Sequence, residues 1–316
     1  MNCKPIVVKK LSIITPCYNE EENVEELHLR IRDIASKLLN YDYEHIYIDN
    51  ASTDRTPAIL RKIAAADPKV KVILNARNFG AIRSQYYGLL QATGDAVAVL
   101  ASDFQDPPEL IPTLVAKWEE GFKAVVGVKN ESEESPLFFF FRRCYYKLVH
   151  RLAETETIQN YTGFGLYDKV VIDICRKLDD PYPFFRGLIS EIGLPTAIVP
   201  YFQPSRKRGI TKNNFYTLYD IAMLGITNHS KVPLRIATML GFAMAFLSLL
   251  TAIGYLVYKL LFWDRFTLGM APVVIGLFLF SSVQLFFIGI LGEYIGAIHT
   301  QVLNRPLVVE KERINF

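Results

Sequence analysis

The sequence predicts an α/β domain with a mostly parallel sheet, followed by a hairpin of two transmembrane helices. Short apolar runs of strand length alternate with helix-like stretches up to residue 128, and this alternation favours parallel strands with right-handed crossovers. Two long segments without a charged residue then follow, at 236–258 and 266–292. Because a helix needs about 20 apolar residues to cross a bilayer, each segment is long enough to span one.

The elements of the α/β domain are expected in the following order. The strands are the apolar runs 11–15, 45–49, 71–74, 96–100 and 124–128, and the helices lie at 21–39, 57–66, 81–92 and 107–119. Asn19 with Glu22 resembles a capping box, and Thr56 stands before a first-turn proline. Asp106, before Pro107, is assigned to the cap of the fourth helix. Ligands of such sheets bind at the carboxyl ends of the strands, so the residues after each strand are the candidates for chemistry.

A different pattern occupies residues 138–152. Aromatic and aliphatic side chains share one helical face there, and basic side chains lie away from it. A basic amphipathic helix with an aromatic face is typical of a membrane interface, and a core-packing helix with a solvated basic side is the alternative. The stretch 215–228 is a second aromatic-rich helix that leads towards the first span. We assign Arg142, Arg143 and Lys147 to contact with the membrane or with a membrane-borne substrate.

Basic residues that flank the two spans predict the orientation of the chain. Lys231 and Arg235 precede the first span, and Arg305 follows the second with two more basic residues after it. The loop at 259–265 carries two basic residues that Asp264 partly offsets. The positive-inside rule therefore predicts a cytoplasmic domain at 1–230, two spans within 231–300 and a cytoplasmic tail at 301–316. The expected location is the plasma or inner membrane, with both termini inside.

Several other classes are disfavoured by composition. Lys9 and Lys10 precede only a short apolar run that ends before Pro16, which does not resemble a signal peptide. The four cysteines form no CxxC pair and no metal pattern, so free thiols in a reducing cytosol are expected. A formal charge of +3 is too small to indicate nucleic acid as a partner.

Acidic and hydroxyl-bearing turns follow the first two strands, at 15–20 and 49–54. Their carboxylates suit the ribose hydroxyls and base N–H groups of a nucleoside. The first turn has no G-x-G-x-x-G, so a dinucleotide fold is not expected. Roles in turns and caps are the alternative for Asn19, Ser52 and Asp54, whereas Asp49 closes an apolar strand and is harder to explain in that way.

Asp103 lies where the fourth strand ends and the next helix has not begun. A carboxylate at that position could hold Mg²⁺ or Mn²⁺, which prefer oxygen ligands and keep several waters. Gln105 could supply a second oxygen, while Asp106 is left to the helix cap. The metal would clamp the diphosphate of a nucleotide-sugar and stabilise the charge that grows on the leaving group.

Together these motifs resemble the family 2 glycosyltransferases. The resemblance rests on the Tyr-Asn-Glu turn at 18–20, the Asp-x-x-Ser-Thr-Asp turn at 49–54, Asn-Phe-Gly at 78–80, and Asp-x-Gln-Asp-Pro-Pro-Glu at 103–109. More narrowly, the chain is similar from about residue 11 to 305 to polyprenyl-phosphate glycosyltransferases, which include dolichyl-phosphate mannose synthases and bacterial undecaprenyl-phosphate glucosyltransferases. This resemblance implies a GT-A fold, a divalent metal, a UDP- or GDP-sugar and inversion at the anomeric carbon.

The resemblance also implies roles for individual residues. The nucleoside would be bound by Pro16, Tyr18, Glu20, Asp49, Ser52 and Asp54. The metal would be bound by Asp103 and Gln105. The run at 206–212 looks like the family's Arg-x-x-Gly-x-Ser/Thr-Lys loop, which would place Arg206 and Lys212 as catalytic groups near donor or acceptor phosphate and Arg208 near the acceptor or membrane. A solvated basic turn, or one held by anionic lipid, is the alternative.

The sequence departs from the family pattern at two positions. Ala101 stands where the family's Asp-x-Asp has its first carboxylate, so Asp103 is left to carry the metal. Gly165, within 163–167, stands where arginine is usual. Arg186 is a candidate to replace that arginine near the acceptor, and an ordinary surface or interfacial role is its alternative.

The predicted reaction is transfer of glucose from UDP-glucose to undecaprenyl phosphate at the cytoplasmic membrane face. A phosphate monoester is largely ionised near neutral pH, so it needs no strong base to attack. Positioning and electrostatics would then dominate catalysis. A processive polysaccharide synthase is a rival, but it normally has more spans and a Gln-x-x-Arg-Trp motif, and no tryptophan here follows an arginine.

A non-catalytic scaffold that binds nucleotide-sugar, or a helper of lipid-sugar translocation, is the alternative outside the enzymes. The departures at Ala101 and Gly165 are its support, and turnover would distinguish it from an enzyme. Small residues in the spans would allow close helix packing and hence a homo-oligomer. These are Gly241, Ala245, Ser248, Gly289, Gly292 and Gly296.

Overall fold

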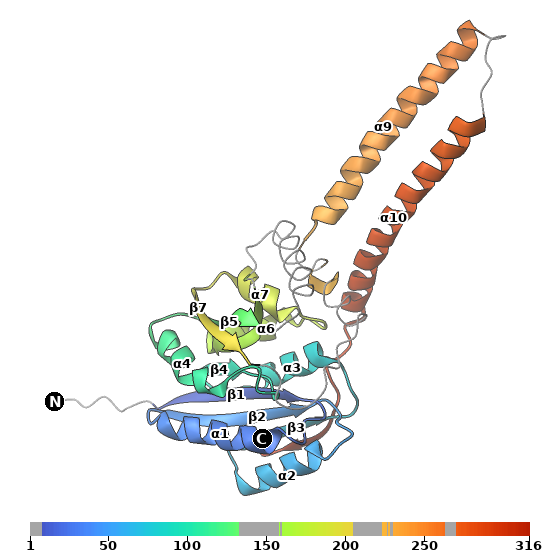
Figure 1. Ribbon diagram of the computed structural model, residues 1–316. Helices are drawn as coiled ribbons and strands as arrows, with labels where there is room; N and C mark the ends of the chain where they lie inside the picture. The colour runs from blue at the N-terminus through green and yellow to red at the C-terminus, as the bar shows by residue number, and fades with distance from the viewer. Residues whose placement is uncertain are drawn as a thin grey trace.

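The computed structural model describes residues 8–132, 158, 160–204, 223–225, 227, 230–262 and 270–316. Its centre is a sheet with the strand order β7-β5-β6-β4-β1-β2-β3-β8 (Figure 1). The strands are β1 (Lys9–Cys17), β2 (Tyr41–Asp49), β3 (Val70–Asn75), β4 (Ala96–Val99), β5 (Ala124–Ser132), β6 (Tyr161–Asp168), β7 (Thr196–Gln203) and β8 (Glu310–Ile314).

Helices cover both faces of this sheet. One face carries α1 (Val24–Lys37), α2 (Thr56–Ala66) and α4 (Ile111–Glu119), and the other carries α3 (Ala81–Leu90), α6 (Lys169–Leu178) and α7 (Phe185–Ile192). Successive residues of β1 point to opposite faces, so Ile13 packs with Leu27 of α1 and Ile14 packs with Leu89 of α3. Burial on both faces explains why the strands read as nearly continuous apolar runs.

The order in which successive strands are added to the sheet reverses at β1, with β2 and β3 on one side and β4 on the other. That strand pairs in parallel with β2 on one side and with β4 on the other, and β2 continues in parallel to β3. Beyond β4 the sheet is mixed, because β6 is antiparallel to β4 and β5 while β5 and β7 are parallel. The fold class is therefore α/β with a mostly parallel sheet, as expected. A ligand crevice should lie outside the carboxyl ends of β1 and β4, where the strand order reverses.

The predicted strands are confirmed, but two helix starts differ from the prediction. The first helix begins at Val24 rather than at 21, with Asn23 at its N-cap and no side-chain cap. The capping box predicted from Asn19 and Glu22 is wrong, because Asn19 Oδ1 instead accepts a hydrogen bond from Thr53 N at 2.7 Å. The stretch expected as a helix from 107 begins as a 3-10 turn, η1 (Pro108–Leu110), because Pro112 at the start of α4 has no N–H to donate to the preceding turn.

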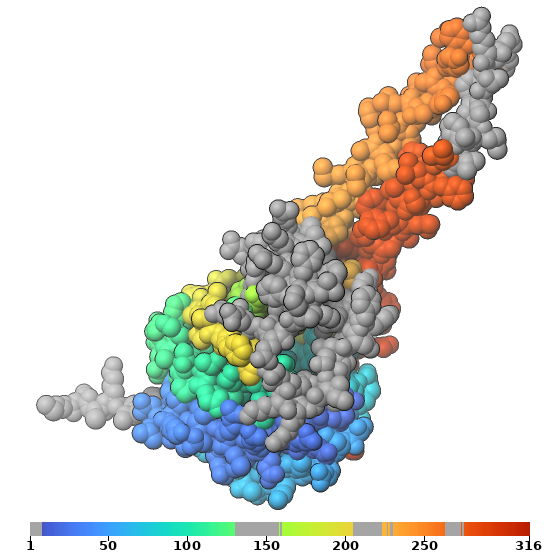
Figure 2. Space-filling view, viewed as in Figure 1, coloured from blue at the N-terminus to red at the C-terminus, as the bar shows by residue number. Residues whose placement is uncertain are grey.

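Two long helices project from the domain, as Figures 1 and 2 show. They are α9 (Val232–Leu261) and α10 (Met270–Leu303), they contact each other, and both contain segments long and apolar enough to cross a membrane. Both helices extend beyond the predicted spans at 236–258 and 266–292. The start of the second span, the helix expected at 138–152 and most of 215–228 lie outside the described residues. The orientation of the hairpin stays a prediction.

The segment after α10 returns to the domain and adds β8 to the edge of the sheet. This strand is antiparallel to β3, with Ile73 opposite Arg313. Arg61 of α2 donates to Glu312 through Nη2 at 2.7 Å and through Nε at 3.1 Å. The expected tail at 301–316 therefore contains a strand that covers an otherwise open edge.

Candidate active site

The turns after β1 and β2 are locked together by side chains that were predicted to bind the nucleoside. Asn19 N donates to the hydroxyl of Ser52 at 2.8 Å, and that hydroxyl in turn donates to Asp49 Oδ1. Ser52 N donates to Asp49 Oδ2 at 3.0 Å. Asp49 is buried, and burial raises the pKa of its carboxyl. Asp49 and Ser52 thus form one unit at the carboxyl end of β2.

Asp54 and Glu20 extend this network. Asp54 accepts from Glu21 N at 3.2 Å and from Thr56 N at 2.9 Å, and so it joins the first turn to the start of α2. Glu20 N donates to Thr56 Oγ1 at 2.9 Å. These bonds agree with the turn roles that the sequence left open for Ser52 and Asp54. Their contact with a nucleoside stays a prediction.

The loop after β4 joins the same region. Ser102 Oγ donates to the carbonyl oxygen of Pro16 at 3.2 Å, and Gln105 N donates to Asp103 Oδ1 at 3.2 Å. Phe104, between these residues, has a φ of 60°, and the turns after β1 and β2 contain Asn19 at 55° and Ala51 at 60°. Non-glycine residues with positive φ are uncommon and gather at functional sites. Here they occur once after each of three neighbouring strands.

A cavity of about 200 Å³ opens at this edge of the sheet. It brings together Pro16, Asp103 and Gln105, three of the residues predicted from sequence. Tyr18, Glu20, Asp49, Ser52 and Asp54 do not line it, and they lie in or beside the adjoining turns. The cavity is also lined by side chains and backbone from α3, β4, β5, β6, β7 and the loop after β4: Gln85, Val99, Ala101, Asp106, Lys129, Thr162, Gly163, Phe164 and Gln203.

Asp106 is a structural anchor of this cavity and not a helix cap. Its Oδ2 accepts from Ala101 N at 3.0 Å, and its Oδ1 accepts from the hydroxyl of Tyr201 at 3.0 Å. The 3-10 turn after it has Pro107 at its N-cap and no side-chain cap. The predicted cap role was therefore wrong, because the carboxylate folds back over its own loop. The pKa of Asp106 is raised to about 6, chiefly by burial and also by the charge of Asp103, while the hydrogen bonds from Ala101 N and Tyr201 act in the opposite direction.

The oxygen atoms that line the cavity fit a hard divalent cation that takes its other ligands from a bound diphosphate and from water. Asp103 supplies a carboxylate and Gln105 an amide oxygen, both on the cavity wall. No group of three metal-ligating side chains occurs among the residues that the structure describes. Mg²⁺ commonly binds through one or two carboxylates, with phosphate oxygens and waters completing its octahedron. Asp103 and Gln105 meet that requirement if a diphosphate is also present.

Gly165 lies where an arginine side chain cannot fit. A Cβ atom at this position would be 2.5 Å from the carbonyl oxygen of Val125 on β5 and 3.1 Å from the hydroxyl of Tyr167. That hydroxyl hydrogen-bonds to the hydroxyl of Tyr161 and donates to Gly163 O at 2.9 Å. Arg186 lies on α7 with its guanidinium carbon 5.7 Å from the centre of the Phe184 ring, and its charge lowers the pKa of Tyr161 against the larger effect of burial. Arg186 is thus near the tyrosine pair.

Six predicted residues cannot be compared with the structure. Arg142, Arg143, Lys147, Arg206, Arg208 and Lys212 lie outside the described residues. Their roles stay predictions from the resemblance.

Four polar residues of the cavity were missed by the sequence reasoning: Gln85, Lys129, Thr162 and Gln203. Thr162 lies on β6, a strand that was not predicted. Lys129 directly follows the predicted strand 124–128, so the rule that pointed to strand ends could have found it. Gln85 lies on α3, where no local signal distinguishes it. Gln203 ends β7, a strand that the sequence reasoning did not predict. Lys129 adds a positively charged side chain to a cavity whose lining also includes the carboxylates of Asp103 and Asp106.

An acidic cavity at the reversal point of an α/β sheet, in a chain that carries two apolar helices, defines a membrane-associated α/β protein with a polar ligand site. The model of the family described as glycosyl transferase family 2 matches residues 12–174. The chain belongs to this family of transferases.

Curated relatives match nearly the whole chain. The SfII prophage-derived bactoprenol glucosyl transferase of Shigella flexneri is 33% identical over 304 residues, which cover 96% of this chain and 98% of that protein. The prophage bactoprenol glucosyl transferase homolog of Escherichia coli K12 is 30% identical over 303 residues, with 96% and 98% covered. The uncharacterized glycosyltransferase YkcC of Bacillus subtilis is 33% identical over 302 residues, with 94% and 92% covered.

Among solved structures, glucosyl-3-phosphoglycerate synthase from Mycobacterium tuberculosis, in complex with Mn²⁺, UDP and phosphoglyceric acid, is similar to this chain. The identity is 20%, the TM-score is 0.46, and 69% of this chain and 76% of the other are covered. The family assignment rests on the sequence matches.

Proposed function

We propose that this protein transfers glucose from UDP-glucose to undecaprenyl phosphate at the cytoplasmic face of the membrane, with inversion at the anomeric carbon. One observation carries the proposal: Asp103 and Gln105 lie on one cavity at the carboxyl end of β4. They do so in a family 2 glycosyltransferase that has two apolar helices. Relatives of nearly the same length are named bactoprenol glucosyl transferases, which supports this choice of donor sugar and acceptor.

The turns after β1 and β2 are proposed to bind the nucleoside. Tyr18, Glu20 and Asp49 would contact the base and ribose, next to the cavity that would hold the diphosphate and sugar. The hydrogen bonds between the two turns support this assignment, because they hold the site in one shape before the donor arrives. A preorganised site loses less conformational entropy on binding.

Asp103 and Gln105 are proposed to hold Mg²⁺ or Mn²⁺. When bound, the cation would neutralise the charge that develops on the departing UDP. Asp103 keeps its carboxylate at the cavity wall through the hydrogen bond from Gln105 N. Lys129 brings a second positive charge to the same cavity, where it would attract the diphosphate. The absence of a second carboxylate at Ala101 would make metal binding depend on the diphosphate.

The acceptor needs little activation. Its phosphate monoester has a second pKa of about 6 and is largely a dianion near neutral pH. The chain therefore has to position this anion behind the anomeric carbon, and the attack would displace UDP from an α-linked donor to give a β-linked product. The prediction that Arg206 and Lys212 hold the two anions together is part of this proposal.

The membrane hairpin follows from the acceptor. A polyprenyl chain stays in the bilayer, so the catalytic domain must be held at the membrane surface. Basic residues before α9 and after α10 support an orientation with the domain and both termini inside.

A scaffold that binds nucleotide-sugar without turnover is the second candidate, and the alanine at position 101 favours it.

Release of UDP distinguishes the glycosyltransferase from the scaffold. Purified full-length protein in detergent would be given UDP-glucose, Mg²⁺ or Mn²⁺, and undecaprenyl phosphate. The proposal expects UDP release that stops when the acceptor is omitted or the metal is chelated. If the protein binds UDP-glucose and several other UDP- and GDP-sugars but releases no nucleotide diphosphate from any of them, the scaffold is favoured.

A further inference from the structure

Two glutamine side chains line the cavity at the carboxyl end of β4 without a hydrogen-bond partner. Gln85 belongs to α3 and Gln203 to the end of β7. Among the residues that the structure describes, neither amide makes a hydrogen bond. The buried amide of Asn50, in contrast, donates to Asn78 Oδ1 and accepts from Phe79 N, both at 2.9 Å. The two glutamines thus have a hydrogen-bonding capacity that the protein itself does not use.

The alternation of side chains along β7 directs Gln203 into the cavity. The buried residues of this strand are Ala197, Val199, Tyr201 and Gln203, so their side chains share its inner face. The hydroxyl of Tyr201 reaches the loop after β4, where it lies 3.0 Å from Asp106 Oδ1. Gln203 lies two residues further towards the carboxyl end of the strand and is only 8% exposed. A buried amide needs a hydrogen-bond partner, and a ligand in the cavity can supply one.

Gln85 reaches the cavity from the other face of the sheet. Its helix α3 packs on the face of Ile14, whereas Tyr201 belongs to the core on the face of Ile13. A Cβ atom added to Gly163 would lie 3.4 Å from Gln85 Nε2, so this amide lies against the backbone of β6. Gly163 has a φ of 104° and leaves free the space that a side chain would fill beside the amide. The two amides therefore approach the cavity from different sides.

The order of the strands indicates which part of a donor these amides would meet. The strands follow one another as β7-β5-β6-β4-β1-β2. Because β6 is antiparallel to β4 and β5, and β7 is parallel to β5, the carboxyl ends of β4 and β7 lie at the same edge. The turns proposed to bind the nucleoside follow β1 and β2, on one side of β4, while β6 and β7 lie on its other side. With the diphosphate at Asp103, the sugar is the part of the donor that extends towards β6 and β7.

Neutral amides suit sugar hydroxyls better than they suit phosphate. An amide offers donors and an acceptor, and a hydroxyl can likewise donate and accept. A phosphate only accepts, and the metal and Lys129 match its charge. Water can bind the amides before the donor arrives, and a sugar hydroxyl can replace that water without loss of hydrogen bonds. A donor that lacks the hydroxyl leaves a buried amide unpaired and is therefore disfavoured.

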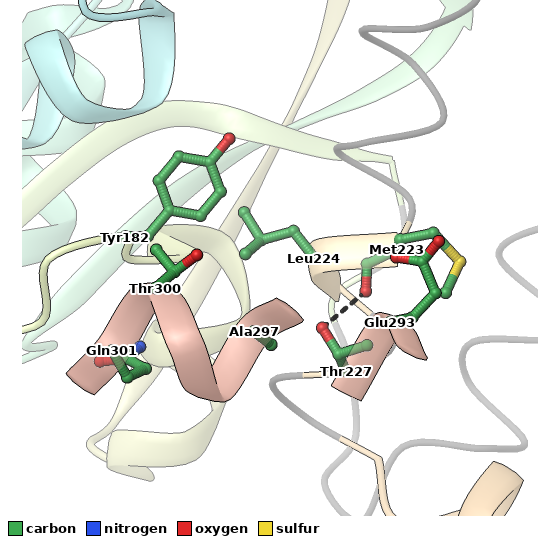
Figure 3. Close-up of a pocket in the computed structure, with 8 residues that line it drawn as sticks. All are labelled: Tyr182, Met223, Leu224, Thr227, Glu293, Ala297, Thr300 and Gln301. Atoms are coloured by element: carbon green, nitrogen blue, oxygen red, sulfur yellow. Dashed lines mark hydrogen bonds between the residues drawn. The ribbon is translucent and has the colours of Figure 1, made fainter. Parts of the chain in front are cut away.

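A cavity beside α10 does not offer an equivalent site. It has a volume of about 210 Å³ and is lined by residues of α10 together with Met223 and Thr227 (Figure 3). Two of its polar side chains have partners within the protein, since the Thr227 hydroxyl donates to Met223 O at 2.9 Å and Gln301 Nε2 donates to Asp180 Oδ1 at 2.8 Å. It shares no lining residue with the cavity at β4. A sugar in it would be separated from a diphosphate at Asp103.

We propose that Gln85 and Gln203 hydrogen-bond to hydroxyl groups of the donor sugar and thereby determine which sugar the protein accepts. The inference rests on the proposed function, to which it adds the residues that recognise the sugar. Asp103 and the metal would hold the diphosphate, which all UDP-sugars share. The two amides would contact the part in which these donors differ.

The test compares binding of UDP-glucose with binding of UDP. Both dissociation constants would be measured by calorimetry on full-length protein in detergent, with Mg²⁺ or Mn²⁺ and without acceptor. Gln85→Leu and Gln203→Leu nearly keep the side-chain volume but remove the amide, and they would be made singly and together. Gln301→Leu removes an exposed amide from α10 and serves as the control.

Each single substitution is expected to weaken UDP-glucose binding about five- to tenfold, because one hydrogen bond to the sugar is lost. The double variant should lose about thirtyfold or more, and the control should match wild type. The dissociation constant for UDP should stay within about twofold in all variants, which also shows that they fold. Unchanged binding of UDP-glucose in the double variant, or equal weakening of UDP and UDP-glucose, would overturn the inference.

Deoxy donors distinguish a direct contact from an indirect effect. Analogues of UDP-glucose without the hydroxyl at one of the sugar carbons would be titrated into wild type and Gln203→Leu. At one carbon, wild type should lose about fivefold or more in affinity, whereas the variant should lose less than about twofold because its contact is already absent. Equal losses in both proteins for every analogue would contradict a contact between Gln203 and the sugar. The same comparison applies to Gln85.

Product formation separates this inference from the proposed function. If the amide substitutions selectively weaken binding of UDP-glucose but wild type forms no glucosylated lipid, the proposed function fails and the sugar recognition stands. If product forms while the binding constants of the variants match wild type, the inference alone fails. A rise in the KM for acceptor without a change in donor binding would mean that the amides contact the acceptor phosphate, and it would also contradict the inference.

Discussion

The hydroxyl of Tyr201 donates a hydrogen bond of 3.0 Å to Asp106 across 95 residues of sequence. Asp106 also accepts from Ala101 N at 3.0 Å, so its carboxylate fixes both ends of the loop that presents Asp103 to the cavity. Tyr201 on β7 thereby helps to hold the shape of the loop that is proposed to bind the metal. Asp106, which the sequence predicted to be a helix cap, is thus the acceptor of both hydrogen bonds.

Removal of this hydroxyl should loosen the loop. Tyr201→Phe leaves the buried Asp106 carboxylate with one hydrogen bond fewer, and we expect a loss of about 1–2 kcal/mol in stability and a lower kcat. Thermal unfolding and UDP release would be measured together. Tyr43→Phe serves as the control, because Tyr43 is half-buried on β2 and does not line the cavity. Wild-type kcat in Tyr201→Phe would contradict the role of the hydroxyl.

Gly165 should not tolerate even the smallest side chain. A Cβ atom there would meet the Val125 carbonyl oxygen at 2.5 Å, and both strands would have to shift. Gly165→Ala should therefore cost about 1–3 kcal/mol, and Gly165→Arg at least as much. The melting temperature in detergent would be compared with that of Gly241→Ala, where nothing lies within 4 Å of the added carbon. Equal melting temperatures for the two alanine variants would refute the steric argument.

The opposite end of the sheet has a buried charge cluster that makes stability depend on pH. Burial alone would raise the pKa of Glu44, but hydrogen bonds from Lys10, Lys71 and Ser12 lower it to about 2. A pKa held at about 2 rather than 4.5 corresponds to about 3 kcal/mol of folding free energy. Because the folded pKa is depressed, this contribution is present above pH 4.5 and is lost as pH falls towards 2.

Glu44→Gln should thus lower the melting temperature clearly at pH 7, and the gap to wild type should narrow as the pH falls below 4.5. Melting curves of both proteins from pH 7 to 3.5 would show this. A gap that stays constant across that range would mean that the charge of Glu44 does not stabilise the fold.

Asn315 ties β8 to the domain. Its Nδ2 donates to the carbonyl oxygens of Ala64 at 2.7 Å and Val70 at 2.8 Å, and its φ is 62°. Asn315→Ala loses both hydrogen bonds and places alanine in the left-handed region, so a loss of about 1–3 kcal/mol is expected. Asn315→Gly loses the bonds without that strain and should cost less. Thermal unfolding would separate the two, and wild-type stability in both would show that this attachment contributes little.

The first half of the fold could be predicted because its strands are buried on both faces. Continuous apolar runs such as the one at 45–49 carry a signal that does not depend on distant residues. The strands β6 and β7 also contain apolar residues, but Gly163 and Gly165 interrupt β6 and Pro200 interrupts β7. β8 consists of four consecutive charged residues followed by Ile314, and its position depends on contacts with Arg61 and β3 that no local pattern encodes.

The candidate site was predictable to a similar extent. Pro16, Asp103 and Gln105 lie together because parallel strands bring their carboxyl ends to one edge. Tyr201 and Gln203 could not be found in this way, since they depend on the pairing of β5 with β7. Asp106 was predicted to be a helix cap because Pro107 follows it, but its carboxylate instead accepts a hydrogen bond from the distant Tyr201.

The central claim is that Asp103 supports transfer of glucose to a polyprenyl phosphate. Its most direct test is the amount of glucosylated undecaprenyl phosphate, measured by mass spectrometry, that wild type, Asp103→Asn and Asp42→Asn produce from UDP-glucose in the presence of Mg²⁺ or Mn²⁺. Asp42 is exposed and pairs with Lys69 away from the cavity. Wild type and Asp42→Asn should form the product at similar rates, and Asp103→Asn at least about a hundredfold more slowly. Product formation by Asp103→Asn at the wild-type rate would contradict the account.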